Sequence, residues 1–409
     1  MAELFQVLAP VEALHRLLQH LKAGLPTEDI PVQDALGRIL AADIFSPIEL
    51  PTFPRSNMDG YAVRAQDTFG ASDGLPAYLK VGGEVPMGEA PRASVRPGEG
   101  VRIPTGAMIP HGADAVVMVE HTQEVDPSTI EVTRPVAPGE NVVRRGEDVT
   151  RGERLVPKGH CLRPQDVGGL LGVGILTVSV VRRPRVVIIA TGDEVVPPDC
   201  EPGPGQVRDI NTYTIATLVL QAGGIPQPLG IVRDDYDALR EAAESGITQG
   251  DALIISAGSS VSTRDMTAGI IGTLGRPGVL VHGVALKPGK PTILAVCQDK
   301  PVFGLPGNPV STFVTFDLFV RPALYHLAGS APPERATVRA RLAKNVASAF
   351  GREDYVPVRL LEEGGEVLAE PVYGKSNLIY TLIRAHGLVT IPLNVGGFSA
   401  GQTVEVRRF

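Results

Sequence analysis

The chain has 409 residues, 43% of them apolar, and a formal net charge of −7. This length indicates two to four domains, and the apolar content is sufficient for folded cores, which excludes a disordered protein. The acidic charge argues against binding to a phosphate backbone. Because Trp is absent and aromatic residues make up only 5%, base stacking on single strands is also not expected. Nucleic acid is therefore not expected as a partner.

The cysteines and the N-terminus indicate a cytoplasmic protein. Cys161, Cys200 and Cys297 are far apart and lack the spacing of a zinc site or a disulfide framework, which favours reduced thiols. The N-terminal segment carries acidic residues and has no unbroken apolar core, so it does not resemble a signal peptide. No run of about 18 apolar residues occurs, and no membrane span is expected.

The first 180 residues are expected to form a short helical part and a β module. A helix is predicted over 10–24, where apolar residues recur at helical spacing, and a second short helix over about 32–40. From 46 to 145, short β-prone pieces alternate with Gly and Pro, which predicts an all-β module. A helix at 164–172 and a strand follow. We assign residues 1–45 and 146–180 to an elongated N-terminal domain and 46–145 to the β module.

Residues 181–329 alternate strands with helices, which predicts right-handed βαβ units and a central, mostly parallel α/β sheet. One of the helices is expected to begin with Asn211 as its cap, and a single long helix is expected to close the domain over 308–329. From 330 to 409 the chain returns to short β segments, which predicts a small β-barrel, with a sandwich as the alternative. The expected fold class is thus multidomain, α/β plus β modules.

Polar residues follow four of the predicted strands. In an open parallel sheet, ligands bind beyond the carboxyl ends of the strands. The segments at these ends are 191–194, 233–235, 257–260 with Asp265 beyond it, and 306–311. Chance would supply one or two such ends, so four favour a shared site, where converging carboxylates would suit Mg²⁺. Alternatively, Asp193 and Glu194 face water, and Asp234 and Asp235 only begin the next helix.

Two of these segments could hold an anion. "SAGSS" offers small residues and backbone N–H groups ahead of a helix, suited to a phosphate; its candidates are Ser256, Gly258, Ser259 and Ser260. An ordinary βα turn is the alternative. "PGNPVS" offers Gly307, Asn308 and Ser311, although a helix start capped by Asn308 explains it equally well.

The segment "LKPGKP" places Lys287 and Lys290 close together. Two such ammonium groups repel each other unless an anion lies between them, and a solvated turn with two exposed lysines is the alternative.

Asp59 in "RSNMDGYAVR" is also ambiguous, because Asp-Gly often forms a tight turn. No Walker A motif, strand-linked G-x-G-x-x-G or G-x-S-x-G occurs. The chain is therefore not expected to be a P-loop NTPase, a dinucleotide-binding enzyme or a Ser-His-Asp hydrolase.

Six motifs occur in order along the chain: "SNMDGYAVR", "PTGAMIPHGADAVVMVE", "RRGEDV", "ATGDEV", "LKPGKP" and "GLPGNPVS". As a set, they resemble the molybdopterin molybdenumtransferase family, the molybdenum insertases that include the E domain of gephyrin. The resemblance implies an enzyme that inserts molybdenum from molybdate into adenylylated molybdopterin and releases AMP, with Mg²⁺ as cofactor. It also implies an elongated homodimer whose site lies between the α/β domain of one subunit and the β module of the other.

The resemblance assigns roles to individual residues. Asp59, Thr105 and Asp148 are implied as catalytic groups offered across the dimer. Glu194, Asp234 and Asp265 are implied as catalytic acids of the α/β domain and as the metal ligands. Lys287 and Lys290 resemble the molybdate-holding pair, and Arg352 and Ser376 resemble substrate-binding residues of the C-terminal domain.

The chain departs from the family pattern at two places. Ala257 stands where the family often has glycine, and Lys375 adds a charge to a loop that is usually rich in Gly and Ser. Two other functions stay open: the preceding molybdopterin adenylyltransferase reaction, whose enzyme resembles the same α/β domain, and a non-catalytic scaffold of the gephyrin type. A molybdopterin adenylyltransferase is also a candidate partner for substrate delivery.

Overall fold

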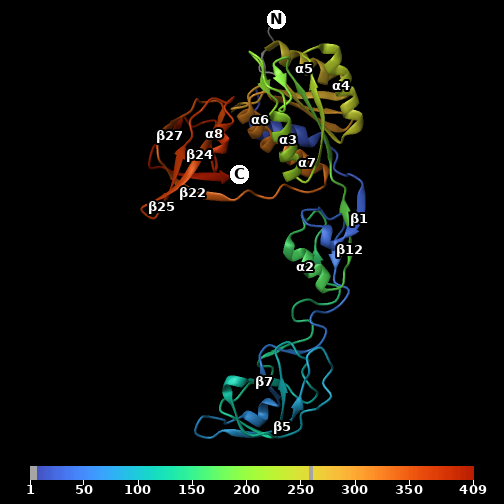
Figure 1. Ribbon diagram of the computed structural model, residues 1–409, viewed down its shortest axis with the longest axis vertical. Coiled ribbons are helices and arrows are strands. Elements are labelled where there is room, and N and C mark those ends of the chain that lie inside the picture. The colour runs from blue at the N-terminus through green and yellow to red at the C-terminus, as the bar shows by residue number, and fades with distance from the viewer. Residues whose placement is uncertain (1–6, 258–260) are drawn as a thin grey trace.

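The computed structural model describes residues 7–257 and 261–409. They form an elongated molecule in which a β module, a middle domain and an α/β domain follow one another, with a barrel beside the α/β domain (Figure 1). Within these described ranges, no helix combines the length and the apolar content that a membrane span requires.

Helix α1 (Pro10–Gln19) packs against the α/β domain, although it precedes the middle domain in the chain. Its Ala13 and Leu17 are fully buried in one core with Leu294 and Phe303 of the central sheet. The predicted domain boundaries stay a prediction, but α1 packs with the sheet rather than with residues 146–180.

Both predicted N-terminal helices are longer than the observed ones. The first ends at Gln19 because the chain then turns, and the Gly24 N–H donates to the Leu327 carbonyl instead of continuing the helix. Of the second, only a 3-10 turn at Val32–Asp34 forms. Gly37 follows with a φ of +72°, and Leu40 bridges to Val180. The prediction of a helix over 32–40 was therefore wrong.

The middle domain is built on two short antiparallel pairs and one helix. Strand β1 (Thr27–Pro31) pairs with β12 (Thr177–Val181), and β2 (Ile44–Phe45) pairs with β11 (Arg154–Val156). Helix α2 (Pro164–Gly172) forms as predicted and buries Leu170 against these strands. The chain crosses this domain twice, once on its way to the β module and once on its return.

The β module is a six-stranded sheet in the order β7-β4-β6-β5-β9-β8. Its strands are β4 (Gly60–Val63), β5 (Ala77–Glu84), β6 (Glu99–Ile103), β7 (Ala115–Met118), β8 (Thr122–Asp126) and β9 (Thr129–Val132). The pair β3 (Arg55–Ser56) and β10 (Val142–Val143) lies where the chain enters and leaves the module, with 3-10 turns at Ala65–Thr68 and Val119–His121. Alternate residues of β4 enter opposite cores, Val63 one and Ala62 the other, so apolar residues cover both faces of the sheet.

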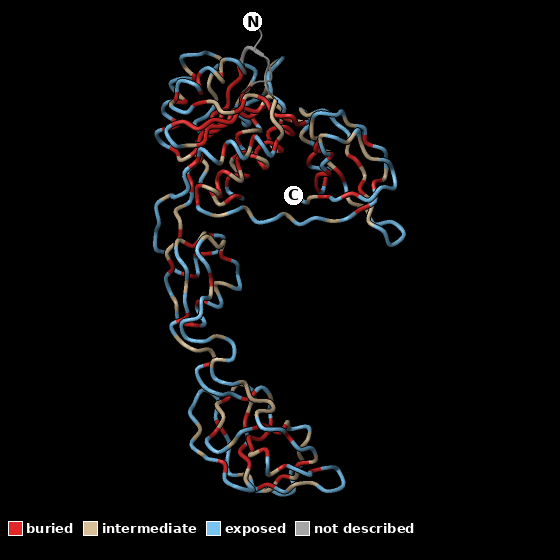
Figure 2. Tube along the Cα trace, turned by 180° about the vertical axis from the view of Figure 1, so that it is seen from behind, coloured by how far each residue is buried: buried red, intermediate tan, exposed pale blue. Residues whose placement is uncertain are grey.

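The α/β domain has a six-stranded sheet in the order β16-β13-β17-β21-β20-β18. Its strands are β13 (Arg185–Thr191), β16 (Ile225–Val232), β17 (Ala252–Ala257), β18 (Pro277–His282), β20 (Ile293–Cys297) and β21 (Lys300–Pro306), with a small parallel pair at β14 (Val195–Val196) and β15 (Val207–Arg208). The first four strands of the order run parallel, and β20 is antiparallel to both neighbours. The sheet is mostly parallel, as predicted, and Figure 2 shows buried residues concentrated along it.

Helices cover both faces of this sheet because its strands alternate their side chains. Val186 and Ile188 of β13 share a core with α3 (Asn211–Gln221), α6 (Pro309–Thr315) and α7 (Arg321–Leu327). Val187 and Ile189 share the other core with α4 (Tyr236–Gln249) and α5 (Val261–Thr273). This two-sided burial explains why the strands appear in the sequence as continuous apolar runs.

The predicted long closing helix forms as one continuous helical segment, but it is not regular. A π-helical turn at Phe316–Val320 separates α6 from α7. Pro322 is the second residue after it and has no N–H to donate, so the regular hydrogen-bond ladder is interrupted there.

The C-terminal domain is a closed five-stranded barrel in the order β24-β25-β22-β28-β26, because β26 pairs back with β24. Its strands are β22 (Thr337–Leu342), β24 (Glu353–Glu363), β25 (Glu366–Pro371), β26 (Gly387–Ile391) and β28 (Thr403–Arg408), with the pair β23 (Val346–Ala347) and β27 (Gly397–Phe398) and helix α8 (Tyr380–Ile383) added. Closure confirms the barrel over the sandwich. Strand β19 (Leu286–Lys287) of the α/β domain pairs with β24 and joins the two domains.

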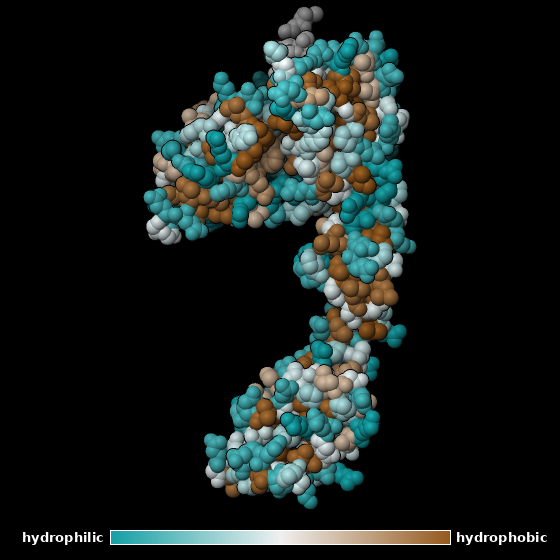
Figure 3. Space-filling view, in the orientation of Figure 1, coloured by the Kyte–Doolittle hydropathy of each residue, from teal (hydrophilic) through white to brown (hydrophobic). Residues whose placement is uncertain are grey.

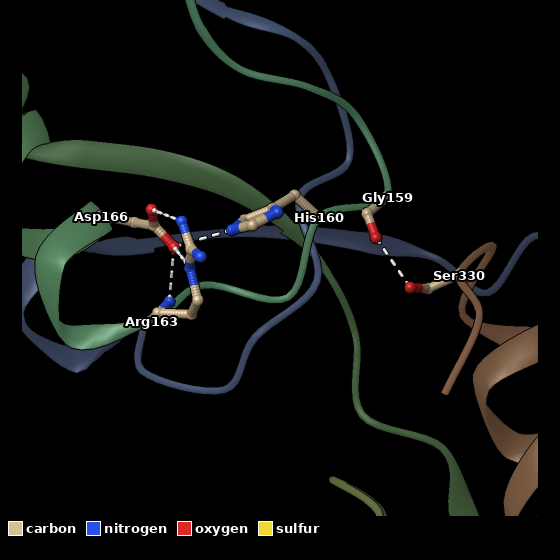
Figure 4. Close-up of polar contacts among 5 residues, drawn as sticks. All are labelled: Gly159, His160, Arg163, Asp166 and Ser330. Carbon is tan, nitrogen blue, oxygen red and sulfur yellow. Dashed lines mark hydrogen bonds and ion pairs between the residues drawn. The ribbon is translucent and has the colours of Figure 1, made fainter. Parts of the chain in front are cut away.

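A second junction joins the middle domain to the end of α7. The Ser330 hydroxyl donates to the Gly159 carbonyl at 2.7 Å (Figure 4). Beside it, the Arg163 guanidinium donates to both carboxylate oxygens of Asp166, and His160 lies 2.7 Å from the same carboxylate. The hydrogen bonds from Arg163 are the largest cause that lowers the pKa of Asp166. An ionised Asp166 thus ties the loop before α2 to the first turn of that helix.

Candidate functional site

Acidic residues meet at the carboxyl ends of β13 and β16, which are neighbours in the sheet. The Thr191 hydroxyl donates to Asp234 Oδ1 at 2.6 Å, and the Asp234 N–H donates to Asp193 Oδ1 at 3.3 Å. Asp235 caps α4 by accepting from the Ala238 N–H, so for this acid the helix-start interpretation is correct. Asp234 therefore lies at a cluster formed by two strand ends, as the sequence predicted.

Gly192 and Glu194 follow the carboxyl end of β13 at the same edge. The φ of Gly192 is +151°, and a Cβ atom there would lie 2.7 Å from Glu194 Oε2. The positive φ favours glycine at this turn, whereas the exposed Glu194 side chain could move away from an added Cβ. Glu194 itself is exposed.

Asn211 links the next two strand ends, a role that the sequence did not reveal. Its Nδ2 donates to the Gly307 carbonyl at 2.7 Å and to Ser256 Oγ at 3.3 Å. The prediction of Asn211 as a helix cap was wrong, because Asp209 accepts from the Thr212 N–H and takes that role. The buried Asn211 Oδ1 has no hydrogen-bond partner among the described residues. Helix α3 begins at Asn211 itself, so this side chain lies inside the first turn. The presence of Asp209 as an alternative cap two residues earlier was the available signal.

The barrel contacts the α/β domain at the start of α6. Asn308 occupies the cap position, but its Nδ2 donates to Ser376 Oγ at 3.0 Å instead of capping the helix. The Val310 N–H donates to the Ser376 carbonyl at 3.0 Å. Ser311 is buried one residue further along. The structure thus brings Gly307, Asn308, Ser311 and Ser376 together, across two domains.

A cavity of about 1290 Å³ lies between the α/β domain and the barrel. Lys287, Lys290, Arg352 and Lys375 line it, and the one acidic side chain in its described lining is Asp354. The side chain of Asp354 is 5% exposed and pairs with Arg352 at 2.9 Å and with Lys287 at 3.6 Å. Four cations against one buried carboxylate leave an excess of positive charge, which favours an anionic ligand.

The cations of this cavity fall into two classes. Lys287 and Arg352 share Asp354, whereas Lys290 and Lys375 have no ion-pair partner in the described part of the chain. Sequence reasoning placed Lys287, Lys290 and Arg352 in one site, and the structure brings them together. Lys375 was noted only as a departure from the family pattern, and it lines the same cavity.

Other predicted residues lie away from the cavity. Glu194 and Asp234 are at the sheet edge and Asp265 is exposed on α5, and these three are not among the described lining residues. Ser256 is buried and reaches the site through Asn211. Gly258, Ser259 and Ser260 lie outside the described residues. Ala257 pairs with Pro306 at the end of the sheet.

Asp59 and Thr105 form a separate pair in the β module, at the far end of the molecule from the cavity (Figure 1). The backbone N–H of Thr105 donates to Asp59 Oδ1 at 2.7 Å and its hydroxyl donates to the same oxygen at 3.0 Å. Gly60 is the first residue of β4, and a Cβ atom there would lie 1.9 Å from the Val117 carbonyl oxygen. The Asp-Gly pair thus opens a strand rather than a hairpin turn. Asp148, predicted as their companion, is exposed in the segment that returns to the middle domain.

Thr105 lowers the pKa of Asp59 below its ordinary value of 3.8, chiefly through the backbone hydrogen bond. Thr105→Val keeps that donor and removes the hydroxyl, so we expect the Asp59 pKa to rise part of the way back. Because the folded pKa is depressed, the stabilisation is present above 3.8 and is lost as the pH falls through the folded pKa. Carboxyl-carbon NMR titration measures both values, and a wild-type midpoint at or above 3.8 would contradict the assignment.

The carboxylates of the sheet edge fit Mg²⁺ only as an ion shared with a substrate. Within the described residues, no group of three or more His, Cys, Asp or Glu side chains could hold a metal ion. Mg²⁺ commonly binds through one or two carboxylates together with substrate phosphates and water. The donor set is therefore compatible with such an ion and incompatible with a closed structural metal site.

Known proteins share this architecture along the whole chain. The MoeA N-terminal region (domain I and II) matches residues 8–174, the "Probable molybdopterin binding domain" matches 187–326, and the MoeA C-terminal region (domain IV) matches 339–409. The molybdopterin molybdenumtransferase of Bacillus subtilis is 35% identical over 97% of this chain and 93% of its own length. The chain belongs to the molybdopterin molybdenumtransferase family. The family resemblance inferred from the six motifs is thereby confirmed.

Further members of the molybdopterin molybdenumtransferase family and two solved structures agree. The molybdopterin molybdenumtransferase of a Nostoc species is 35% identical over 96% of this chain and 91% of its own length. A crystal structure of the molybdopterin biosynthesis moeA protein from Pyrococcus horikoshii OT3 matches with a TM-score of 0.86 and 34% identity, covering 99% of this chain and 100% of that one. Another, from Pyrococcus horikosii, matches with a TM-score of 0.79 and 40% identity, covering 98% and 99%.

Proposed function

We propose that this protein is a transferase of molybdenum cofactor biosynthesis that inserts molybdenum from molybdate into adenylylated molybdopterin and releases AMP. The observation that carries the proposal is the cationic cavity between the α/β domain and the barrel, within a chain of the molybdopterin molybdenumtransferase family. Molybdate is an oxyanion, and the unpaired ammonium group of Lys290 provides a partner for it.

Some residues of the cavity would bind molybdate, and others would orient the residues that bind it. Lys290 and Lys287 would concentrate molybdate close to the dithiolene sulfurs, so that much of the rate enhancement comes from proximity. Asp354 orients Lys287 and Arg352 through its two ion pairs. Asn211 and Asn308 hold the strand ends and the barrel loop beside the cavity, which keeps the anion-binding groups in place.

Mg²⁺ belongs to this proposal as a cofactor at the sheet edge. Glu194 and Asp234 would hold it, with Asp265 as a further candidate ligand. When bound there, Mg²⁺ would neutralise phosphate charge and stabilise the departing AMP. Asp234 is already oriented by the Thr191 hydroxyl, which leaves its second carboxylate oxygen for a ligand.

A homodimer is part of the proposal, because Asp59 and Thr105 are far from the cavity of their own chain (Figure 1). Apolar residues gather on the surface of the middle domain, as Figure 3 shows. The exposed apolar residues of this domain include Leu36, Phe45, Leu171 and Leu176. A second copy covering these residues could offer the Asp59 pair, and the exposed Asp148, to the sheet edge of its partner.

Replacing Leu171 and Leu176 with aspartate is expected to convert the dimer into a monomer. Each buried leucine would contribute about 2 kcal/mol. Because a symmetric interface uses both leucines twice, the double variant should weaken dimerisation by about 8 kcal/mol, roughly 10⁵-fold or more. Size-exclusion chromatography with light scattering measures this. Leu75→Asp changes a leucine of the β module whose exposure matches that of Leu176; it is the control and should leave the dimer intact. A dimeric double variant would contradict this interface.

The activity is tested by following AMP release from adenylylated molybdopterin. We expect release only when molybdate is added. Release of pyrophosphate from ATP with molybdopterin would instead assign the adenylyltransferase reaction, and absence of any turnover with intact peptide binding would assign a scaffold.

The proposal also places the protein in the cytoplasm, where free thiols such as Cys200 persist. A molybdopterin adenylyltransferase is the proposed supplier of the substrate.

A further inference from the structure

Two aromatic side chains line the cationic cavity and are largely exposed within it. Phe350 is 75% exposed and Tyr373 is 64% exposed, and both are among the lining residues. Phe350 comes from the loop before β24, and Tyr373 from the loop after β25. Both rings therefore present apolar surface to the same cavity.

Local contacts position both rings. The Tyr373 hydroxyl donates to the Asn345 carbonyl at 2.8 Å, and the Asn345 side chain in turn accepts from the Ala400 N–H at 2.7 Å. Phe350 lies against Gly396, where an added Cβ atom would come within 3.3 Å of its ring. The glycine therefore leaves space for the ring. Neither aromatic residue is needed for the barrel core, which is built from other side chains.

The chemistry of the cavity indicates the class of ligand. An aromatic face that is exposed to water is stabilised when a flat ligand ring stacks on it and buries its apolar surface. The same cavity carries the unpaired Lys290 and Lys375, which favour an anionic group. A volume of about 1290 Å³ is also far more than a single oxyanion requires. A fused heteroaromatic ring joined to phosphate matches both parts of the lining.

We propose that Phe350 and Tyr373 form a stacking platform for the fused heteroaromatic ring of the substrate. This inference rests on the proposed function for the identity of that ring, which is the pterin or the adenine of adenylylated molybdopterin. Lys290 and Lys375 bind the anionic groups beside it. The platform sets how deeply the substrate enters the cavity and therefore where its sulfurs meet the molybdate.

The platform is tested by binding alone, without turnover. Neopterin monophosphate and AMP are titrated separately into the full-length protein by calorimetry; because the chain contains no Trp, pterin fluorescence gives a second readout. We expect Phe350→Ala and Tyr373→Ala to weaken the binding of the same one of the two probes, each about tenfold. This is the size expected for the loss of one base-stacking contact. Weakening of the pterin probe assigns the pterin ring to the platform, and weakening of AMP assigns the adenine.

Matched variants separate stacking from other effects. Tyr373→Phe keeps the ring and loses only its hydrogen bond to Asn345, so it should weaken binding much less than Tyr373→Ala does. Phe69→Ala removes an exposed ring of the β module and should change nothing. Unchanged affinity of both alanine variants for both probes would overturn the platform, as would an equal loss in Tyr373→Phe and Tyr373→Ala. Ring-dependent binding without molybdate-dependent AMP release would refute the proposed function and leave the platform standing.

Discussion

Lys290→Ala is expected to lower molybdate-dependent AMP release about a hundredfold, the usual loss on removing one preorganised group that binds an oxyanion. Lys290 lines the cavity, is exposed within it and has no ion-pair partner among the described residues. Its charge is therefore available to a ligand, whereas the charges of Lys287 and Arg352 are partly compensated by Asp354. No buried carboxylate is left unpaired by the change, so stability should be unaffected.

Activity and thermal unfolding must be measured on the same preparations. Lys344→Ala is the matched control, because Lys344 pairs with Glu370 on the barrel and is not among the lining residues. It should keep nearly full activity. Higher molybdate concentration should partly rescue Lys290→Ala if the lysine acts by binding this anion. A variant with full activity at low molybdate would contradict the proposed role.

Asp317→Ala is expected to destabilise the protein by about 3–5 kcal/mol, the range for breaking a buried ion pair from one side. The side chain of Asp317 is 3% exposed and lies in the π-helical turn between α6 and α7. Arg335 donates to its Oδ1 at 2.8 Å, and Arg407 lies 2.9 Å from its Oδ2. Arg321 approaches at 4.0 Å. Without the carboxylate, these arginines would stay partly buried and uncompensated.

The position of Asp317 gives this loss a second consequence. Arg335 belongs to the linker after α7, and Arg407 belongs to β28 of the barrel, so one carboxylate ties three segments together. We therefore expect reduced activity as well, because the barrel supplies one wall of the cavity. Denaturant unfolding measures the stability, and Glu366→Ala, which breaks the exposed Arg341–Glu366 pair, should cost less than about 1 kcal/mol. Equal effects of the two changes would contradict the argument.

Patterns of neighbouring residues in the chain predicted most of the secondary structure. The α/β sheet was recognised because β13 and β17 are continuous apolar runs, which follows from their burial on both faces. The errors occurred where a long-range contact outweighed a local preference. Asn211 has the propensity of a cap but binds Gly307. A helix was predicted over 32–40, but Ile39 and Leu40 bridge to the distant Cys161 and Val180. The sequence left the role of Asp59 open, and in the structure its Asp-Gly pair lies where a bend leads into strand β4.

The candidate site was only partly visible in the sequence. Lys287, Lys290, Asn308 and Ser376 were named in advance, and the structure places them around one cavity or its edge. Three features could not be predicted: the ion pair of Lys287 with Asp354, the position of Lys375 in the cavity lining and the exposure of Phe350. Each depends on how the barrel docks against the α/β domain. That docking is set by contacts such as those of Asp317, between residues far apart in the chain.

The sequence by itself determined the order of the domains, the alternation of strands and helices, and the family to which the chain belongs. These properties depend on local periodicity and on motifs that stay contiguous. The tertiary structure alone decided which charges are compensated, which rings face a cavity and which acids share an edge. Those properties depend on distances between separate segments, and only the packing of the folded chain sets such distances.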